Sequence, residues 1–206
     1  MKTELIRADH PVAIEHAVDI LKNGGIIAFP TDTVYGLAVL AFHSEMIESL
    51  YIVKGRNSTR SIAILIGEIS QLNLIISSMN PIASALAQKF WPGPLTLVVP
   101  GHPHLPGNLS PTPNIGVRMP NHPIALALLR QSGPLAVTSA NLSGQENTIT
   151  AQEVMNQLRG RIHLVMDGGS TPGGVPSTVV DCSGLEPLIL RPGPIDQLQI
   201  QEVLQA

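Results

Sequence analysis

The chain has 206 residues, enough to bury a full hydrophobic core as one large domain or two small ones. Charged residues make up 13% of it, about half the usual ~25% share, so each Lys or Arg outside a solvated helix face needs an explanation. The net charge of −3 gives no global attraction to nucleic acid or anionic membranes. Cys182 is the only cysteine, which excludes an intrachain disulfide and suits a reducing cytosol.

The N-terminal segment carries acidic residues and lacks a long apolar core, so we expect no signal peptide. No apolar run approaches the ~18 residues that a membrane-spanning helix needs. These features favour a cytoplasmic protein without a membrane partner.

The first predicted element is a helix. Asp9 is placed to cap it, with Pro11 near its first turn. An apolar stripe running to Leu21 marks its inner face, and Gly24-Gly25 ends it.

Strands and helices alternate along the rest of the chain. Short apolar runs predict strands at 26–29, 62–66, 96–99, 115–119, 135–138, 162–166, 177–180 and 188–191. Helices are predicted from Ser44, from Asn80-Pro81 to about Phe90, from Pro123 to Arg130, from the capping box of Thr150 and Glu153, and at the end of the chain. This order predicts a single-domain α/β fold over residues 1–206, built on an open, twisted, mixed sheet with flanking helices.

Small hydroxyl residues follow the first predicted strand, in the motif Pro30-Thr31-Asp32-Thr33-Val34-Tyr35-Gly36-Leu37. One interpretation is a polar strand exit in which Asp32 is a turn residue. The other is a pocket for a small polar ligand, because open α/β sheets bind ligands at the carboxyl ends of their strands.

Cations gather in a second motif, Lys54-Gly55-Arg56, with Arg60 one turn later. They could stabilise a helix C-terminus and otherwise be solvated. However, Gly55 interrupts the helix between them, so we expect an exposed turn that meets an anionic ligand.

A hydroxyl and an amide follow another apolar run, in Thr138-Ser139-Ala140-Asn141. Such residues often form a local turn with their own backbone. They are also groups that hold a phosphorylated substrate.

Arg118 lies within the apolar run Ile115–Pro120, where a charge is costly unless it is paired. It is either half of a structural ion pair or the partner of a ligand carboxylate, a bidentate task that suits guanidinium. The glycine-rich stretch from Asp167 to Gly174 lacks the residues of a P-loop. His102 and His104 have no evident third ligand, so no metal site is predicted.

The order and spacing of these motifs resemble the YrdC-like family, the threonylcarbamoyl-AMP synthases. The resemblance runs from about Ala8 to Pro194 and matches the short, single-domain form, a fold with a concave ligand cleft. It departs from the commoner pattern at Asn57 and at Ser61-Ile62, where relatives usually have prolines, and at Leu65, where some have His.

The resemblance implies a role for thirteen residues. The implied ATP-binding residues are Lys54, Arg56, Arg60, Asn114, Ser139, Asn141, Asn147 and Arg191, of which Lys54, Arg56 and Ser139 would be catalytic. The implied threonine-binding residues are Thr33, Leu65, Arg118, Val137 and Ser177.

The resemblance also implies the reaction. L-Threonine, bicarbonate and ATP would give threonylcarbamoyl-AMP and pyrophosphate, with Mg²⁺ carried in by ATP. The product would pass to a separate transferase that modifies tRNA. The stretches at 100–113 and 168–176 are candidates for a lid that protects this labile product.

Two other functions compete with this one. The same fold could be an RNA-binding module, or bind RNA weakly beside its enzymatic role, and it could be a paralogue without synthase activity. Cations spread over an open surface would favour RNA. Cations that converge on one pocket with Thr33 and Ser139 would favour ATP and an amino acid.

Overall fold

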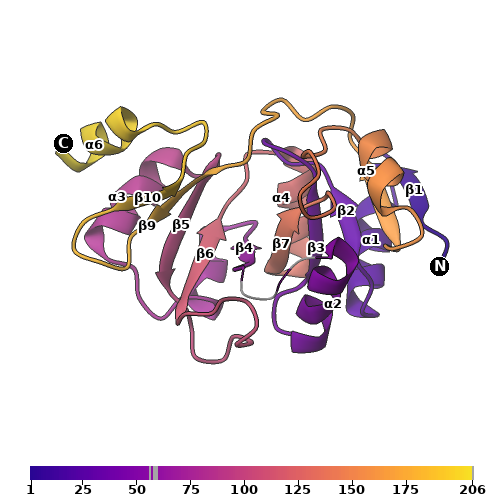
Figure 1. The fold of residues 1–206 in the computed structure, drawn as a ribbon, viewed down its shortest axis with the longest axis horizontal. Helices are drawn as coiled ribbons and strands as arrows, with labels where there is room; N and C mark the ends of the chain where they lie inside the picture. Colours follow the sequence, from indigo (N-terminus) through magenta and orange to yellow (C-terminus); the bar gives the residue numbers. More distant parts are fainter. Residues whose placement is uncertain (56, 58–59, 206) are drawn as a thin grey trace.

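The structure is a computed structural model that describes residues 1–55, 57 and 60–205. Its ten strands form one mixed sheet in the order β1-β8-β2-β3-β7-β4-β6-β5-β9-β10 (Figure 1). The strands are β1 (Glu4–Arg7), β2 (Ile27–Phe29), β3 (Gly36–Leu40), β4 (Ala63–Leu65), β5 (Leu95–Pro100), β6 (Asn114–Arg118), β7 (Leu135–Ser139), β8 (Leu164–Asp167), β9 (Thr178–Asp181) and β10 (Leu188–Arg191). The predicted fold class is therefore confirmed.

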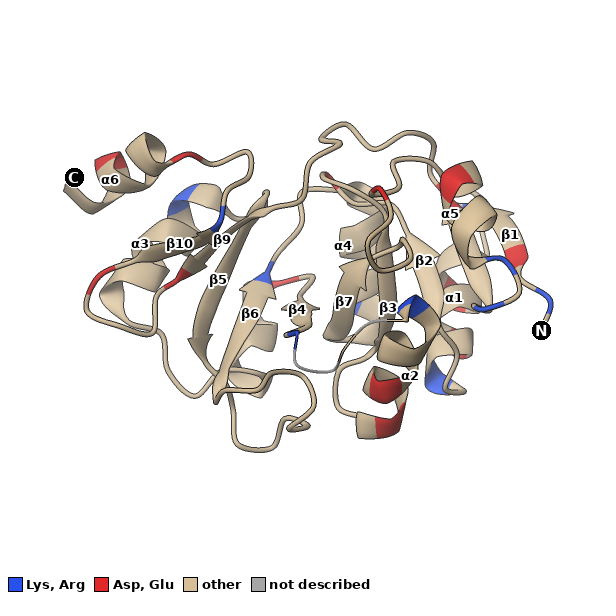
Figure 2. Ribbon diagram, in the orientation of Figure 1, with Lys and Arg blue, Asp and Glu red and all other residues tan. Residues whose placement is uncertain are grey.

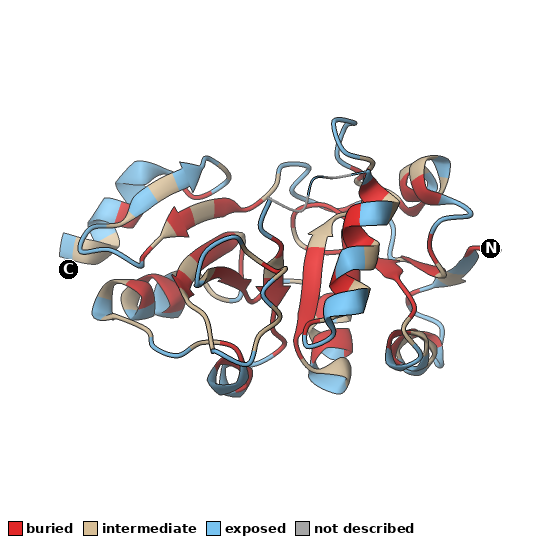
Figure 3. Cartoon of the chain, turned by 60° about the horizontal axis from the view of Figure 1, so that its bottom comes forward, coloured by how far each residue is buried: buried red, intermediate tan, exposed pale blue. Residues whose placement is uncertain are grey.

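Six α-helices flank the sheet within the described residues. They are α1 (Ala13–Lys22), α2 (Ser44–Lys54), α3 (Pro81–Phe90), α4 (Pro123–Ser132), α5 (Ala151–Leu158) and α6 (Gln197–Gln205), and a short 3-10 helix, η1, spans Ile69–Leu74. The helices turn buried stripes inward and exposed stripes outward (Figure 3). Most of their fold comes from burial of these stripes against the sheet.

Local sequence signals set some helix ends correctly and others not. The capping box of Thr150 and Glu153 starts α5, and the Asn80 side chain accepts from the Ala83 amide at the start of α3. The prediction that Asp9 caps α1 is wrong. Val12 precedes the helix, and Asp9 instead pairs with Arg7 at 2.6 Å.

Two strands were missing from the sequence prediction. β1 is an edge strand, too short and too exposed to show an apolar run. β3 begins at Gly36, inside the hydroxyl-rich motif, and pairs antiparallel with both β2 and β7. Its pairing with β7 places Gly36 opposite Ser139, so the first and third sequence motifs become neighbours.

One face of the sheet carries helices over only part of its width. On this face α1 and α4 pack against Ile27 and Phe29 of β2 and Ala38 of β3. The opposite face is the core around Ile64, Leu97 and Val117, which α2, α3 and α5 also join. Beyond α4, over β4, β6, β5 and β9, the first face lines a cavity.

Candidate functional site

The cavity has a volume of about 480 Å³ and follows the two-residue period of the strands. Its floor is formed by every second residue: Ala63 and Leu65 of β4, Thr96 and Val98 of β5, Asn114, Gly116 and Arg118 of β6, Val137 and Ser139 of β7, and Val179 and Asp181 of β9. Gly116 keeps the floor low, because a Cβ there would lie 3.1 Å from the Thr96 methyl. The predicted concave cleft is thus present.

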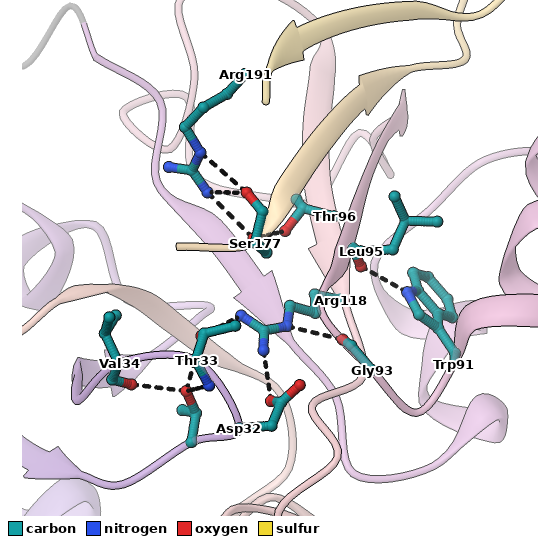
Figure 4. A network of polar contacts seen from close by, with 11 residues as sticks. Asp32, Thr33, Val34, Trp91, Gly93, Leu95, Thr96, Arg118, Ser177 and Arg191 are labelled. Atoms are coloured by element: carbon teal, nitrogen blue, oxygen red, sulfur yellow. Dashed lines mark hydrogen bonds and ion pairs between the residues drawn. The ribbon is translucent and has the colours of Figure 1, made fainter. Parts of the chain in front are cut away.

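Arg118 is buried at the centre of this floor, held by three groups (Figure 4). Its Nε donates to the Gly93 carbonyl and its Nη1 to Thr33 Oγ1, each at 3.0 Å, and its Nη2 pairs with Asp32 at 2.5 Å. Guanidinium has five N–H donors, so two remain beyond these three bonds. The two interpretations of Arg118 are therefore compatible: it is half of a buried ion pair, and it lines the cavity.

Burial lowers the pKa of Arg118, while the Asp32 carboxylate opposes this shift. Asp32 also lies near His122, whose pKa is lowered by burial and raised by Asp32. The Nδ1 atom of His122 is buried without a hydrogen-bond partner in the described part of the chain. Asp32 is thus more than a turn residue, because its charge balances the guanidinium.

The hydroxyl motif after β2 is an ordered turn rather than a flexible exit. Thr31 Oγ1 donates to the Val34 carbonyl at 2.6 Å, accepts from the Thr33 amide at 3.2 Å, and lies 3.0 Å from Thr33 Oγ1. Both threonines are buried and both line the cavity. This turn fixes the Thr33 hydroxyl against Arg118.

A second polar group lies across the cavity from Thr33, at the start of β9. Ser177 Oγ and Thr96 Oγ1 are 2.8 Å apart, and both side chains are buried. Arg191 donates from Nε and Nη2 to the Ser177 carbonyl, at 3.0 and 2.8 Å, and from Nη2 to Ser177 Oγ (Figure 4). Ser177 and Arg191 are thus brought together as the sequence implied. Thr96 was not predicted, although its alternation with Val98 along an apolar strand was a readable signal.

Lys54 contradicts the prediction of an exposed cationic turn. Gly55 does end α2 in a left-handed conformation, with φ of 60°, but Lys54 is 96% buried (4% exposed). Its Nζ donates to the Ser139 carbonyl and to the Asn141 carbonyl, the latter at 2.6 Å. The reason is that carbonyls at the end of β7 offer an ammonium better partners than solvent does. Lys54 does not line the cavity, so it acts by holding the Ser139 loop.

The remaining predicted residues divide clearly. Asn141 is buried outside the cavity, where its Nδ2 donates to the Leu142 and Gln145 carbonyls at 2.9 and 2.8 Å. Arg60 is exposed and does not line the cavity, and Arg56 lies outside the described residues. The predicted residues that do line the cavity are Thr33, Leu65, Asn114, Arg118, Val137, Ser139, Asn147, Ser177 and Arg191.

Of the two predicted lid segments, 168–176 is the better anchored. It runs from β8 across to β9, along the top of Figure 1. The Tyr35 hydroxyl donates to the Gly169 carbonyl at 2.8 Å, and the Gly174 amide donates to the Thr33 carbonyl at 2.8 Å. Burial raises the pKa of Tyr35 to about 12, so its hydroxyl stays a donor at neutral pH. From 100–113, Ser110 and Thr112 reach the rim of the cavity.

The cations are not gathered on an open surface. Arg118 and Arg191 both line the cavity with Thr33 and Ser139, and the other Lys and Arg are scattered over the molecule (Figure 2). This arrangement favours small anionic ligands over RNA. Within the residues that the structure describes, no group of His, Cys, Asp and Glu could hold a metal ion, and no helix is long and apolar enough to cross a membrane.

Comparison with known proteins agrees with this geometry. A family model described as "Telomere recombination", for Sua5, YciO and YrdC proteins, matches residues 19–193. The chain belongs to the Sua5/YciO/YrdC family.

Members of this family with curated names are similar to most of the chain. A threonylcarbamoyl-AMP synthase of Bacillus subtilis is 42% identical over 197 residues, covering 93% of this chain and 56% of the relative. A putative threonylcarbamoyl-AMP synthase of Mycobacterium tuberculosis is 38% identical, covering 93% of this chain and 88% of the relative. The chain therefore spans little more than half of the first relative and nearly all of the second.

A solved structure of the family matches the fold closely. The crystal structure of P. abyssi Sua5 complexed with L-threonine superposes with a TM-score of 0.94 at 35% identity, covering 99% of this chain and 61% of that one. That protein binds L-threonine, as its description states.

Proposed function

We propose that this chain is an L-threonylcarbamoyladenylate synthase, which condenses L-threonine, bicarbonate and ATP to threonylcarbamoyl-AMP and pyrophosphate. The observation that carries the proposal is the cavity in which Arg118, Thr33 and Ser177 face Ser139, Asn147 and Arg191. The named relatives and the threonine complex of P. abyssi Sua5 support it.

Threonine binding follows from the unused donors of Arg118. The two remaining guanidinium N–H groups match a carboxylate, and charge-assisted bidentate contacts of this kind are strong and specific. Asp32 keeps the guanidinium oriented before threonine arrives. The hydroxyls of Thr33 and Ser177, with Leu65 and the Val137 backbone, would enclose the rest of the amino acid.

The chemistry needs orientation and charge stabilisation more than a protein nucleophile. The threonine amine and bicarbonate would form an N-carboxylated threonine with loss of water. A carboxylate oxygen of that group would then attack the α-phosphorus of ATP, and the bond from that phosphorus to the bridging oxygen would break as pyrophosphate leaves. Ser139, Asn147, Asn114 and Arg191 would hold the nucleotide, with Mg²⁺ entering on the phosphates as part of the substrate.

Lys54 and Asn141 have a supporting role in this proposal, because they brace the loop that presents Ser139. Arg56 and Arg60 remain proposed phosphate contacts of the same turn. The mixed anhydride would then be passed to a separate transferase that modifies tRNA.

Pyrophosphate release, measured by a coupled assay, tests the proposal. Release should require ATP, Mg²⁺, threonine and bicarbonate together, and omission of any one should reduce it to background. Equal release without threonine, or none under any condition, would contradict the proposal. A paralogue without synthase activity would give the second result.

A further inference from the structure

Asp181 at the end of β9 is the one acidic residue among the described residues that line the cavity. Its Oδ1 accepts from the Ser183 amide at 2.9 Å and from Ser183 Oγ at 2.7 Å. These bonds fix the carboxylate and leave Oδ2 as a further acceptor. An acid in a cleft for polyanionic substrates is unfavourable unless it faces a hydrogen-bond donor or a cation.

The sheet register places Asp181 far from the proposed threonine position. Asp181 pairs with Val98, Val98 with Gly116, Gly116 lies on the strand beside Ala63, and Ala63 pairs with Val137. Asp181 is therefore four strands from Val137, about 19 Å at the usual strand spacing. The threonine ammonium, held near Arg118 and Val137, is not the donor that Asp181 meets.

The surroundings of Asp181 are apolar. Val98, Val179 and Leu190 line the same end of the cavity, and Leu190 is 54% exposed at the rim. Phosphate and carboxylate groups find neither hydrogen-bond donors nor positive charge in these three side chains. An aromatic base can pack against them, and hydroxyl groups beside the base can donate to a carboxylate.

We propose that the β9–β10 end of the cavity is a nucleoside subsite, in which Val98, Val179 and Leu190 contact the base and Asp181 accepts from the ribose hydroxyls. This inference rests on the proposed function, since it assigns the nucleoside of ATP to that end. The triphosphate then runs toward Ser139 and Asn147, and its charge stays away from Asp181.

Binding of separate fragments of ATP tests the subsite without turnover. Calorimetry is performed on the whole chain with adenosine, with 2′,3′-dideoxyadenosine and with magnesium tripolyphosphate. In the unaltered protein, adenosine should bind about tenfold to a hundredfold more tightly than the dideoxy compound, the range for hydrogen bonds to a charged acceptor. Asp181→Ala should abolish this difference and leave tripolyphosphate binding within about twofold.

Two further variants control for side effects. Asp181→Asn retains an oxygen for Ser183, so it should fold normally and still weaken adenosine. Glu186→Gln removes an exposed acid at the same sheet edge but outside the cavity, and it should leave all three ligands unchanged.

An unchanged preference for adenosine in Asp181→Ala would overturn the proposal, as would failure of adenosine to bind the unaltered protein. Weakened tripolyphosphate with unchanged adenosine would also overturn it, because Asp181 would then serve the metal ion. Failure of the synthase proposal gives a different result: no pyrophosphate release, whatever the adenosine data show.

Discussion

Arg118 shows how one residue can serve both stability and binding. Its guanidinium is buried against Asp32, whose side chain is only 10% exposed, and it still lines the cavity. A role toward ligand alone would make its replacement by a long apolar residue nearly neutral for stability. The ion pair with Asp32 changes that expectation.

We predict that Arg118→Met lowers the free energy of unfolding by roughly 3–5 kcal/mol, because it leaves the Asp32 carboxylate buried and unpaired. Arg118→Met combined with Asp32→Asn should recover most of this loss, since no unpaired charge remains. Neither variant should bind threonine. Denaturant unfolding and threonine titration measure the two effects, and normal threonine affinity in the double variant would reject the carboxylate-binding role.

The pH dependence of stability should report on His122. Burial lowers its pKa below the usual 6.5, so near that pH the unfolded chain binds a proton more readily than the folded one. The free energy of unfolding should therefore fall as the pH drops below about 6.5. In His122→Gln this contribution is absent, so its stability relative to the unaltered protein should rise from pH 7 to pH 5.

The control is His104→Gln, which replaces an exposed histidine. Its unfolding free energy should follow that of the unaltered protein across the same pH range. Parallel curves for His122→Gln and the unaltered protein would show that His122 does not titrate as its burial requires.

At the scale of elements, α2 and the loop after β7 form one unit through Lys54. The ammonium is enclosed by backbone oxygens of Ser139 and Asn141, so the helix end fixes the loop. This arrangement differs from a solvated cation that stabilises a helix C-terminus.

Lys54→Met should cost roughly 1.5–3 kcal/mol of stability, since buried carbonyls lose a charged donor. It should also weaken ATP binding through a displaced Ser139. Lys22→Met is the matched control, a lysine in the last turn of α1 that is exposed, and it should change neither quantity. Weaker ATP binding at unchanged stability would mean that Lys54 meets the phosphates directly.

The sequence predicted elements with strong local signals and missed those that depend on pairing. The capping box of α5 and the Asn80-Pro81 start of α3 are local, so both were predictable. β3 was not, because its first residue lies in a polar motif and its strand character comes from pairing with β2 and β7.

The candidate site shows the same division. Residues that follow strands, such as Thr33 and Ser139, were predicted to meet in one cleft, and they do. The side-chain direction of Lys54 and the partner of Arg118 depend on distant segments, 85 and 86 residues away in sequence. Thr96 and Asp181 required knowledge of which strand face the helices leave uncovered.

At the scale of the whole molecule, function depends on incomplete helical cover of one sheet face. There, α1 and α4 bury the β2 and β3 end of the face, and the remainder lines the cavity. The segment 168–176 then crosses above and is bonded to Tyr35 and Thr33. A single sheet can therefore bring motifs from residues 31 to 191 into one cleft.

The identity of the product tests the central claim most directly. The chain is incubated with ATP, Mg²⁺, threonine and ¹³C-bicarbonate, and the nucleotide products are analysed by mass spectrometry at short times. We predict a threonylcarbamoyl adenylate that carries one ¹³C atom, formed in step with pyrophosphate. A threonyl adenylate without the label, or unchanged ATP, would contradict the account.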